Sequence, residues 1–234
     1  MLLAEDLLLL LTDDATGRVR GEADTGIGAA LLIDLALLGR VRITEKGERD
    51  HKPDRVIVAN PAPTDHRVLD AALAKIGDRA RSAGDTVSRL SSGFTKPLLA
   101  GLTAQGLLTE EKKTFLGVSA GSRWTPAEDS NHELQVRRAL IDVLIDGQEP
   151  DVHLACLIAL LSGIDEIEQV VLKDNRHLLA AMDIDARAID KKALKRRAKD
   201  LESQNFAAAG ARKAIEAAMA AMTASTVAAT AISS

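Results

Sequence analysis

The chain has 234 residues and 46% hydrophobic content, which is ample for a core and excludes a disordered protein. Its 34 acidic and 30 basic residues give a net charge of −4, which excludes a general electrostatic attraction to nucleic acid or to an anionic membrane. The single cysteine, Cys156, excludes an internal disulfide and fits a reducing compartment.

The first half of the chain predicts helices and one β-hairpin. Leu2 to Thr12 reads as a core helix rather than a signal peptide, because acidic residues flank its leucine run on both sides. A second helix, from Thr25 to Leu38, carries leucines at helical spacing and is expected to end at Gly39. Alternation then predicts a hairpin with strands Arg40 to Thr44 and Arg55 to Ala59.

Further elements follow in order to the end of the chain. Thr64 or Asp65 is expected to cap a helix that buries Val68, Leu69, Leu73 and Ile76. A second hairpin is predicted with strands Thr114 to Val118 and Arg123 to Thr125 around the tip SAGS. The remaining predicted helices span Asp85 to Leu90, Leu98 to Gln105, Glu128 to Ile145, Val152 to Ser162, Asp165 to Leu172, Arg176 to Met182, Asp185 to Leu201 and Asn205 to Ala224.

These elements predict the fold class: mainly α, a single compact multi-helix domain with two β-hairpins. No stretch resembles a flexible linker. The uncharged end from Ala217 to Ile232 is about 16 residues long, short for a membrane span of roughly 20. We therefore expect a soluble chain without a transmembrane helix.

Motifs that would indicate catalysis or a metal are weak. GVSAG (residues 117–121) matches the nucleophile elbow G-x-S-x-G, but Ser119 is followed by hairpin residues instead of a helix. The five histidines contain no i, i+4 pair, and the pair His153 and Cys156 lacks further ligands at suitable spacing. We expect no enzyme activity, no cofactor and no metal.

Two stretches offer sites for an anion. Gly26 and Gly28 open the helix of TGIGAAL, so their amides and the helix dipole could hold a phosphate, although the glycines could equally serve close packing. Six basic residues crowd the helix after Asp190 and indicate either an anion site or a solvated face. They are Lys191, Lys192, Lys195, Arg196, Arg197 and Lys199.

The second hairpin combines apolar and cationic residues. Phe115, Leu116, Val118 and Trp124 surround its small tip, with Arg123 beside the indole. This combination suits a bilayer interface or a subunit contact, and packing on the protein's own core is the alternative.

The order of several segments resembles the Golgi phosphoprotein 3 family, which includes bacterial members. EDLLLLLTDDATGRV, TGIGAALLIDLALLGRVRI and AQGLLTEEKKTFL precede LIALLSGIDEIEQVV and IEAAMAAM, and the resemblance covers Leu2 to Met222. It implies a mostly α-helical, non-enzymatic domain that associates peripherally with membranes. Its eukaryotic relatives bind phosphatidylinositol 4-phosphate, insert a hydrophobic hairpin and act as adaptors that retain glycosyltransferases in the Golgi.

The resemblance carries over to individual residues only in part. Phe115 and Leu116 match the family's aromatic-aliphatic hairpin pair. The positions that match the family's head-group tryptophan and three arginines have other residues here, so the resemblance does not extend to inositide specificity. Those positions hold Val19, Gly28, Ser92 and Thr95.

We therefore expect a domain over residues 1–225 with a tail at 226–234, on the cytoplasmic face of a membrane. Arg18, Arg20, Gly26, Gly28 and Lys96 are the candidates for holding an anionic phospholipid head group. The second hairpin would enter the interface or mediate homo-oligomerisation, and membrane enzymes are possible clients. The alternative is a winged-helix-like adaptor for nucleic acid or protein, because a helix followed by a hairpin is also the shape of a wing.

Overall fold

The fold was analysed in a computed structural model of the chain, which describes residues 1–20, 23–115, 118–127, 130–203, 213–222 and 224. Helices dominate it, and each sheet in the described part is a two-stranded antiparallel hairpin. The predicted fold class is confirmed.

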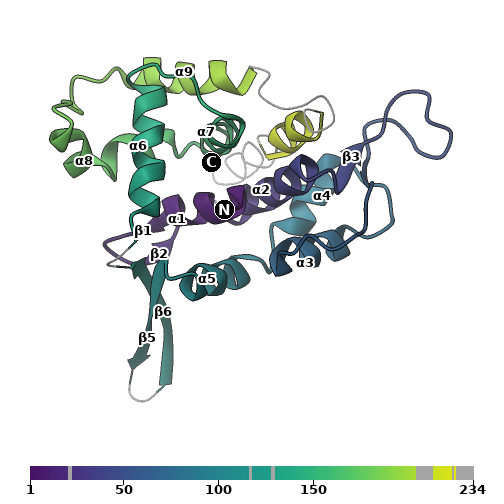
Figure 1. The fold of residues 1–234 in the computed structure, drawn as a ribbon, viewed down its shortest axis with the longest axis horizontal. Helices are drawn as coiled ribbons and strands as arrows, with labels where there is room; N and C mark the ends of the chain where they lie inside the picture. Colours follow the sequence, from purple (N-terminus) through teal and green to yellow (C-terminus); the bar gives the residue numbers. More distant parts are fainter. Residues whose placement is uncertain (21–22, 116–117, 128–129, 204–212, 223, 225–234) are drawn as a thin grey trace, which may run out of the picture.

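Helix α1 (Leu3–Leu11) lies at the centre of the domain, where α2, α5, α6 and α7 pack around it (Figure 1). All nine of its residues are buried, including the carboxylates of Glu5 and Asp6. Its leucine run is therefore a core helix, as predicted. A helix that is apolar all round is stable in water only when neighbouring elements cover every face of it.

Helix α2 (Ala23–Leu37) packs along α1 and ends where the glycine predicted it. Gly39 has φ of 65°, a left-handed conformation that suits glycine and stops the helix. The chain then forms β3 (Val41–Ile43) and β4 (Val56–Val58), paired with Arg42 opposite Ile57. The first hairpin is thus where the alternation placed it.

Helices α3 (Arg67–Ile76), α4 (Ala83–Leu90) and α5 (Thr95–Ala104) follow. The expected cap of α3 is wrong, because its N-cap is His66, whose side chain makes no capping hydrogen bond. Thr64 acts indirectly: its hydroxyl accepts the His66 amide at 3.3 Å and donates to Asp70 at 2.7 Å.

The second hairpin is longer than predicted, with strands β5 (Leu108–Phe115) and β6 (Val118–Pro126). A third, unpredicted hairpin pairs β1 (Thr12–Asp13) with β2 (Arg18–Val19) beside its base. Both project from the same edge of the helical body in Figure 1.

After β6, the described part of the chain is mainly helical, although the helix predicted from Asp185 begins only at Lys191. Parts of the helices predicted over Glu128 to Ile145 and Asn205 to Ala224, residues 128–129 and 205–212, lie outside the described residues. Helix α6 crosses the domain, α7 packs against α1, and α9 covers α7 (Figure 1). The predicted helix from Asp165 to Leu172 contains a π-helix, which the sequence did not indicate. The elements are α6 (His132–Leu144), α7 (Val152–Gly163), η1 (Gln169–Lys173), α8 (Arg176–Ala181), α9 (Lys191–Ser203) and a helix over residues 213–222.

Candidate functional site

The β5–β6 hairpin is the most prominent projection of the domain (Figure 1). Leu108 pairs with Pro126 at its base and Phe115 with Val118 at its far end. Seven steps along the strand at roughly 3.3 Å each carry that last pair about 23 Å from the base. The predicted tip SAGS is wrong, because these residues belong to β6. Leu116 lies outside the described residues.

The base of this hairpin is fixed to the turn between β1 and β2. The Trp124 amide donates to the Gly17 carbonyl at 3.1 Å, and Arg123 Nη2 donates to the Ala15 carbonyl at 2.7 Å. Gly17 has φ of 63°, and a Cβ there would lie 2.1 Å from Arg123 Cγ. Only glycine fits this crossing, so the hairpin is held rigidly at its root.

Trp124 and Arg123 are therefore base residues and not tip residues, which corrects the expectation that the indole enters a bilayer. Trp124 is half-buried and packs against the core. Its partner in the register is Glu110, near the base of the stem. The described pair farthest from the base is Phe115 with Val118.

The serine of GVSAG lies inside this hairpin. Ser119 pairs with Thr114 in the β5–β6 register, two residues from the turn. A nucleophile elbow needs a strand, a sharp turn and then a helix. The backbone around Ser119 does not have that geometry, so the motif match carries no catalytic argument.

The three cationic head-group candidates differ in availability. Arg18 on β2 and Lys96 in the first turn of α5 are exposed. Arg20 instead turns inward, with a side chain only 15% exposed. Its guanidinium pairs with Glu166 at 3.2 Å and with Asp174, and it also donates to the Leu10 carbonyl. Arg18 and Lys96 can therefore contact an anion from solvent, whereas the guanidinium of Arg20 is already paired with carboxylates.

The two glycine candidates differ in position. Helix α2 begins at Ala23, which makes Gly28 its sixth residue, so the Gly28 amide bonds within the helix. A Cβ on Gly28 would lie 2.7 Å from the Val87 carbonyl oxygen and from Ser91 Oγ. Close packing therefore explains Gly28 and corrects the head-group role expected for it, whereas the role of the Gly26 amide stays a prediction.

Ser92 and Thr95 make local contacts. The Thr95 hydroxyl donates to the Asp24 carboxylate, and Lys75 Nζ donates to the Ser92 carbonyl at 2.6 Å. Neither residue supplies a cation for an anionic head group.

The basic helix α9 is only partly free. Lys191 pairs with Glu168 and Lys195 with Asp165, both at 2.7 Å, and Arg197 Nε donates to the Val143 carbonyl. Figure 1 shows α9 at the end of the domain opposite the hairpin tip. These lysines and the tip therefore cannot touch one flat surface together.

A cluster of buried acids and histidines surrounds the first turn of α1, and sequence reasoning missed it. Asp6 lies 2.6 Å from Nε2 of both His132 and His153, and Glu5 lies 3.4 Å from His66 Nε2. Asp34 of α2 accepts the Leu3 and Ala4 amides, and burial raises its pKa to about 6. The signal was present: two acids stand inside an apolar run.

This cluster does not form a metal site. Among the described residues, no group of three or more His, Cys, Asp or Glu side chains is arranged to hold a metal ion. Cys156 is buried, which raises the pKa of its thiol to about 12 and leaves it unreactive. The pairing of His153 with Cys156 is replaced by the pairing of His153 with Asp6.

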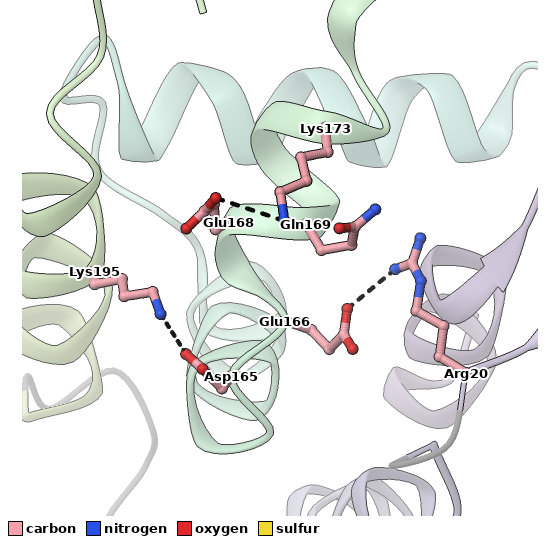
Figure 2. Close-up of a pocket in the computed structure, with 7 residues that line it drawn as sticks. All are labelled: Arg20, Asp165, Glu166, Glu168, Gln169, Lys173 and Lys195. Carbon is pink, nitrogen blue, oxygen red and sulfur yellow. Dashed lines mark hydrogen bonds and ion pairs between the residues drawn. The ribbon is translucent and has the colours of Figure 1, made fainter. Parts of the chain in front are cut away.

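A polar pocket of about 440 Å³ lies around Arg20, between η1 and α9 (Figure 2). Two of its lining residues were candidates from the sequence: Arg20 for a head group and Lys195 as part of the basic stretch after Asp190. The others come from parts of the chain distant from Arg20: Asp165, Glu166, Glu168, Gln169 and Lys173.

Fold and surface together define a mainly helical domain with a rigidly rooted, projecting hairpin. The sequence model of the Golgi phosphoprotein 3 (GPP34) family matches residues 3–218, so the chain belongs to that family. A comparison with curated proteins finds no match. In the described residues, no helix is both long and apolar enough to span a bilayer.

Proposed function

We propose that this GPP34-family domain is a non-catalytic adaptor that associates peripherally with the cytoplasmic face of a membrane through the tip of the β5–β6 hairpin. The observation that carries the proposal is the hairpin itself. It projects from the body, is locked at its root by Gly17, and brings Phe115 and Val118 together at its end. An apolar tip on a rigid stem can enter the interface without unfolding any other part.

Anionic phospholipid would be attracted by the exposed cations of Arg18 and Lys96 if the hairpin lies along the membrane surface, because Arg18 is beside its base. Phosphoinositide specificity does not belong to the proposal. The positions that match the family's head-group arginines hold Gly28, Ser92 and Thr95, and Asp24 lies beside Thr95. The negative surface charge of the membrane would decide which lipids the domain prefers. The number of phosphates on an inositol ring would not affect that preference.

The alternative of a winged-helix adaptor for nucleic acid gains no support. Helix α2 precedes the first hairpin as a recognition helix would, but twelve of its fifteen residues are buried, including its Asp34. A recognition helix must expose a face to the major groove. No surface of α2 can do so without unpacking the core.

The test is co-sedimentation with vesicles of phosphatidylcholine, alone or mixed with phosphatidylglycerol. We expect binding that is stronger with phosphatidylglycerol, and Phe115→Asp should reduce it severalfold because a carboxylate is costly in the interface. Trp124→Phe is the matched control: it changes an aromatic residue at the base of the same hairpin and should leave binding unchanged. Failure to sediment with either vesicle would overturn the proposal.

Vesicles containing phosphatidylinositol 4-phosphate complete the test. At equal surface charge, we expect them to bind the domain no more tightly than phosphatidylglycerol vesicles do. A marked preference would show that this chain recognises the inositol head group by residues other than those the family resemblance indicates.

A further inference from the structure

The pocket around Arg20 is not explained by membrane association. It lies between η1 and α9, while the tip of the hairpin is at the opposite end of the domain (Figures 1 and 2). Its volume of about 440 Å³ falls within the range of small-molecule sites, roughly 300–1,000 Å³. All seven lining side chains are charged or polar, so its ligand must be polar as well.

The π-helix η1 shapes one wall. Its wider turn is closed by the hydrogen bond from the Asp174 amide to the Gln169 carbonyl at 3.0 Å. The three middle residues, 170–172, are buried and anchor the turn, while Gln169 and Lys173 at its two ends line the pocket. Such π-turns are costly and recur at functional sites.

One side of the pocket has an excess of negative charge. Glu166 and Asp174 share the single guanidinium of Arg20. Behind them, Arg137 lies 3.9 Å from Asp174 but is already paired with Glu133. Burial raises the pKa of Glu166 even with Arg20 beside it, so this carboxylate would gain from a further cation. In all, four carboxylates share two guanidiniums here: Asp14, Glu133, Glu166 and Asp174 with Arg20 and Arg137.

The other side has an excess of positive charge. Glu168 Oε1 is shared by two lysines, Lys191 at 2.7 Å and Lys173 at 3.6 Å. Lys173 is the more distant of the two and its side chain is 49% exposed, so it is the ammonium available to an incoming oxyanion. Lys195 and Asp165 form an ion pair with each other, so their charges cancel.

We infer that this pocket binds a small zwitterion, with the ligand's ammonium group against Glu166 and its phosphate or carboxylate group against Lys173. A simple polyanion would meet the three lining carboxylates, and a simple polycation would meet Arg20 and the two lysines. A ligand that carries both charges matches both sides of the pocket. The inference stands on the pocket alone and does not depend on the proposed membrane association.

The experiment is isothermal titration calorimetry of the full chain with phosphoethanolamine, ethanolamine and inorganic phosphate. We expect phosphoethanolamine to bind at least about tenfold more tightly than either fragment, because it makes both charge contacts at once. No binding of phosphoethanolamine up to about 10 mM would overturn the inference, and so would equal affinity for inorganic phosphate.

Two substitutions test the two ends of the ligand. Lys173→Gln should reduce the affinity for phosphoethanolamine to that for ethanolamine, and Glu166→Gln should reduce it to that for phosphate. Lys199→Gln is the matched control: it removes the same charge from an exposed position on α9 outside the pocket and should leave the affinity unchanged. An equal loss in the control would mean that net charge alone is responsible and would overturn the inference. Lys173 is exposed, so its variant remains informative even if Glu166→Gln loosens Arg20.

A separate experiment distinguishes a head group that is attached to lipid from the free zwitterion. If the head group is still attached to lipid, Lys173→Gln should weaken sedimentation with phosphatidylethanolamine vesicles, whereas equal sedimentation of the wild type and the variant identifies the free form. Phe115→Asp should leave calorimetric binding of phosphoethanolamine intact, so the failure of one proposal can be told from the failure of the other.

Discussion

His153 Nε2 lies 2.6 Å from Asp6 Oδ2, and this hydrogen bond joins the first turn of α7 to the first turn of α1. His132, the first residue of α6, contacts the other oxygen at the same distance. The Asp6 side chain is only 3% exposed, so one buried carboxylate serves two imidazoles at the meeting point of three helix N-termini. The helix dipoles favour the negative charge there and fix how α6 and α7 sit on α1.

This contact makes stability depend on pH. The hydrogen bond to Asp6 raises the pKa of His153 above its ordinary 6.5. Folding therefore favours the protonated imidazole, and its stabilising contribution is complete below the unfolded pKa and disappears as the pH rises through the folded one. We expect His153→Gln to lower the free energy of unfolding more at about pH 6 than at about pH 8.5, as measured by urea titration. His177→Gln, an exposed histidine on α8, should show no such difference.

Asp34 gives an effect of the same sign. Burial raises its pKa from 3.8 to about 6, although the Leu3 and Ala4 amides oppose the shift. The folded state thus binds a proton more tightly than the unfolded state does, and the protein gains stability as the pH falls through 6. Between pH 7.5 and pH 5, linkage gives the wild type roughly 1 kcal/mol more stability than an Asp34→Asn variant gains. Parallel stability curves for the two proteins would contradict this assignment.

Gly28 allows α2 and α4 to approach closely, and alanine tests this. A Cβ would meet the Val87 carbonyl at 2.7 Å and the Ser91 amide nitrogen at 2.8 Å, and neither backbone atom can move freely. We expect Gly28→Ala to lower the free energy of unfolding by about 1–3 kcal/mol. Gly101 lies within α5 with nothing within 4 Å of its Cβ position, so Gly101→Ala should stabilise by about 0.5–1 kcal/mol. Thermal denaturation of both variants measures the contrast, and equal changes in both would contradict the close approach.

The same contact excludes larger side chains at position 28. Any residue with a Cβ would meet the Val87 carbonyl and Ser91, so this position can hold a head-group-binding side chain only if α2 and α4 move apart.

The sequence predicted helices such as α3 well because its apolar residues Val68, Leu69, Leu73 and Ile76 recur at helical spacing. It predicted α1 and α2 from long leucine-rich runs that are buried on nearly every side. It misplaced the second hairpin for a physical reason. Thr109, Glu110, Glu111 and Lys112 are all exposed in β5, so this part of the strand has no alternation of buried and exposed residues to read. Its pairing with β6, which the sequence of β5 does not show, keeps it extended.

The site residues were harder to predict, since their partners are distant in sequence. Asp6 and His153 are 147 residues apart, and Arg20 and Glu166 are 146 apart. A single sequence shows that two acids, Glu5 and Asp6, interrupt an apolar run. It does not show which histidines hydrogen-bond to them in the fold. The composition of the Arg20 pocket could likewise come only from the fold.

The last prediction concerns the base of the β5–β6 hairpin, which can be followed by the fluorescence of a single tryptophan. Trp124 is the chain's one tryptophan and there is no tyrosine, so intrinsic emission reports the hairpin base. A Cβ at Gly17 would meet Arg123 Cγ at 2.1 Å and the Trp124 carbonyl at 2.7 Å. We expect Gly17→Ala to separate β6 from the β1–β2 turn, shift the emission to the red and increase acrylamide quenching. Gly39→Ala places alanine at nearly the same φ, 65°, with nothing within 4 Å of the new atom. It carries the backbone strain without the clash, so it should leave the emission unchanged, and a red shift in both variants would count against the proposed contact.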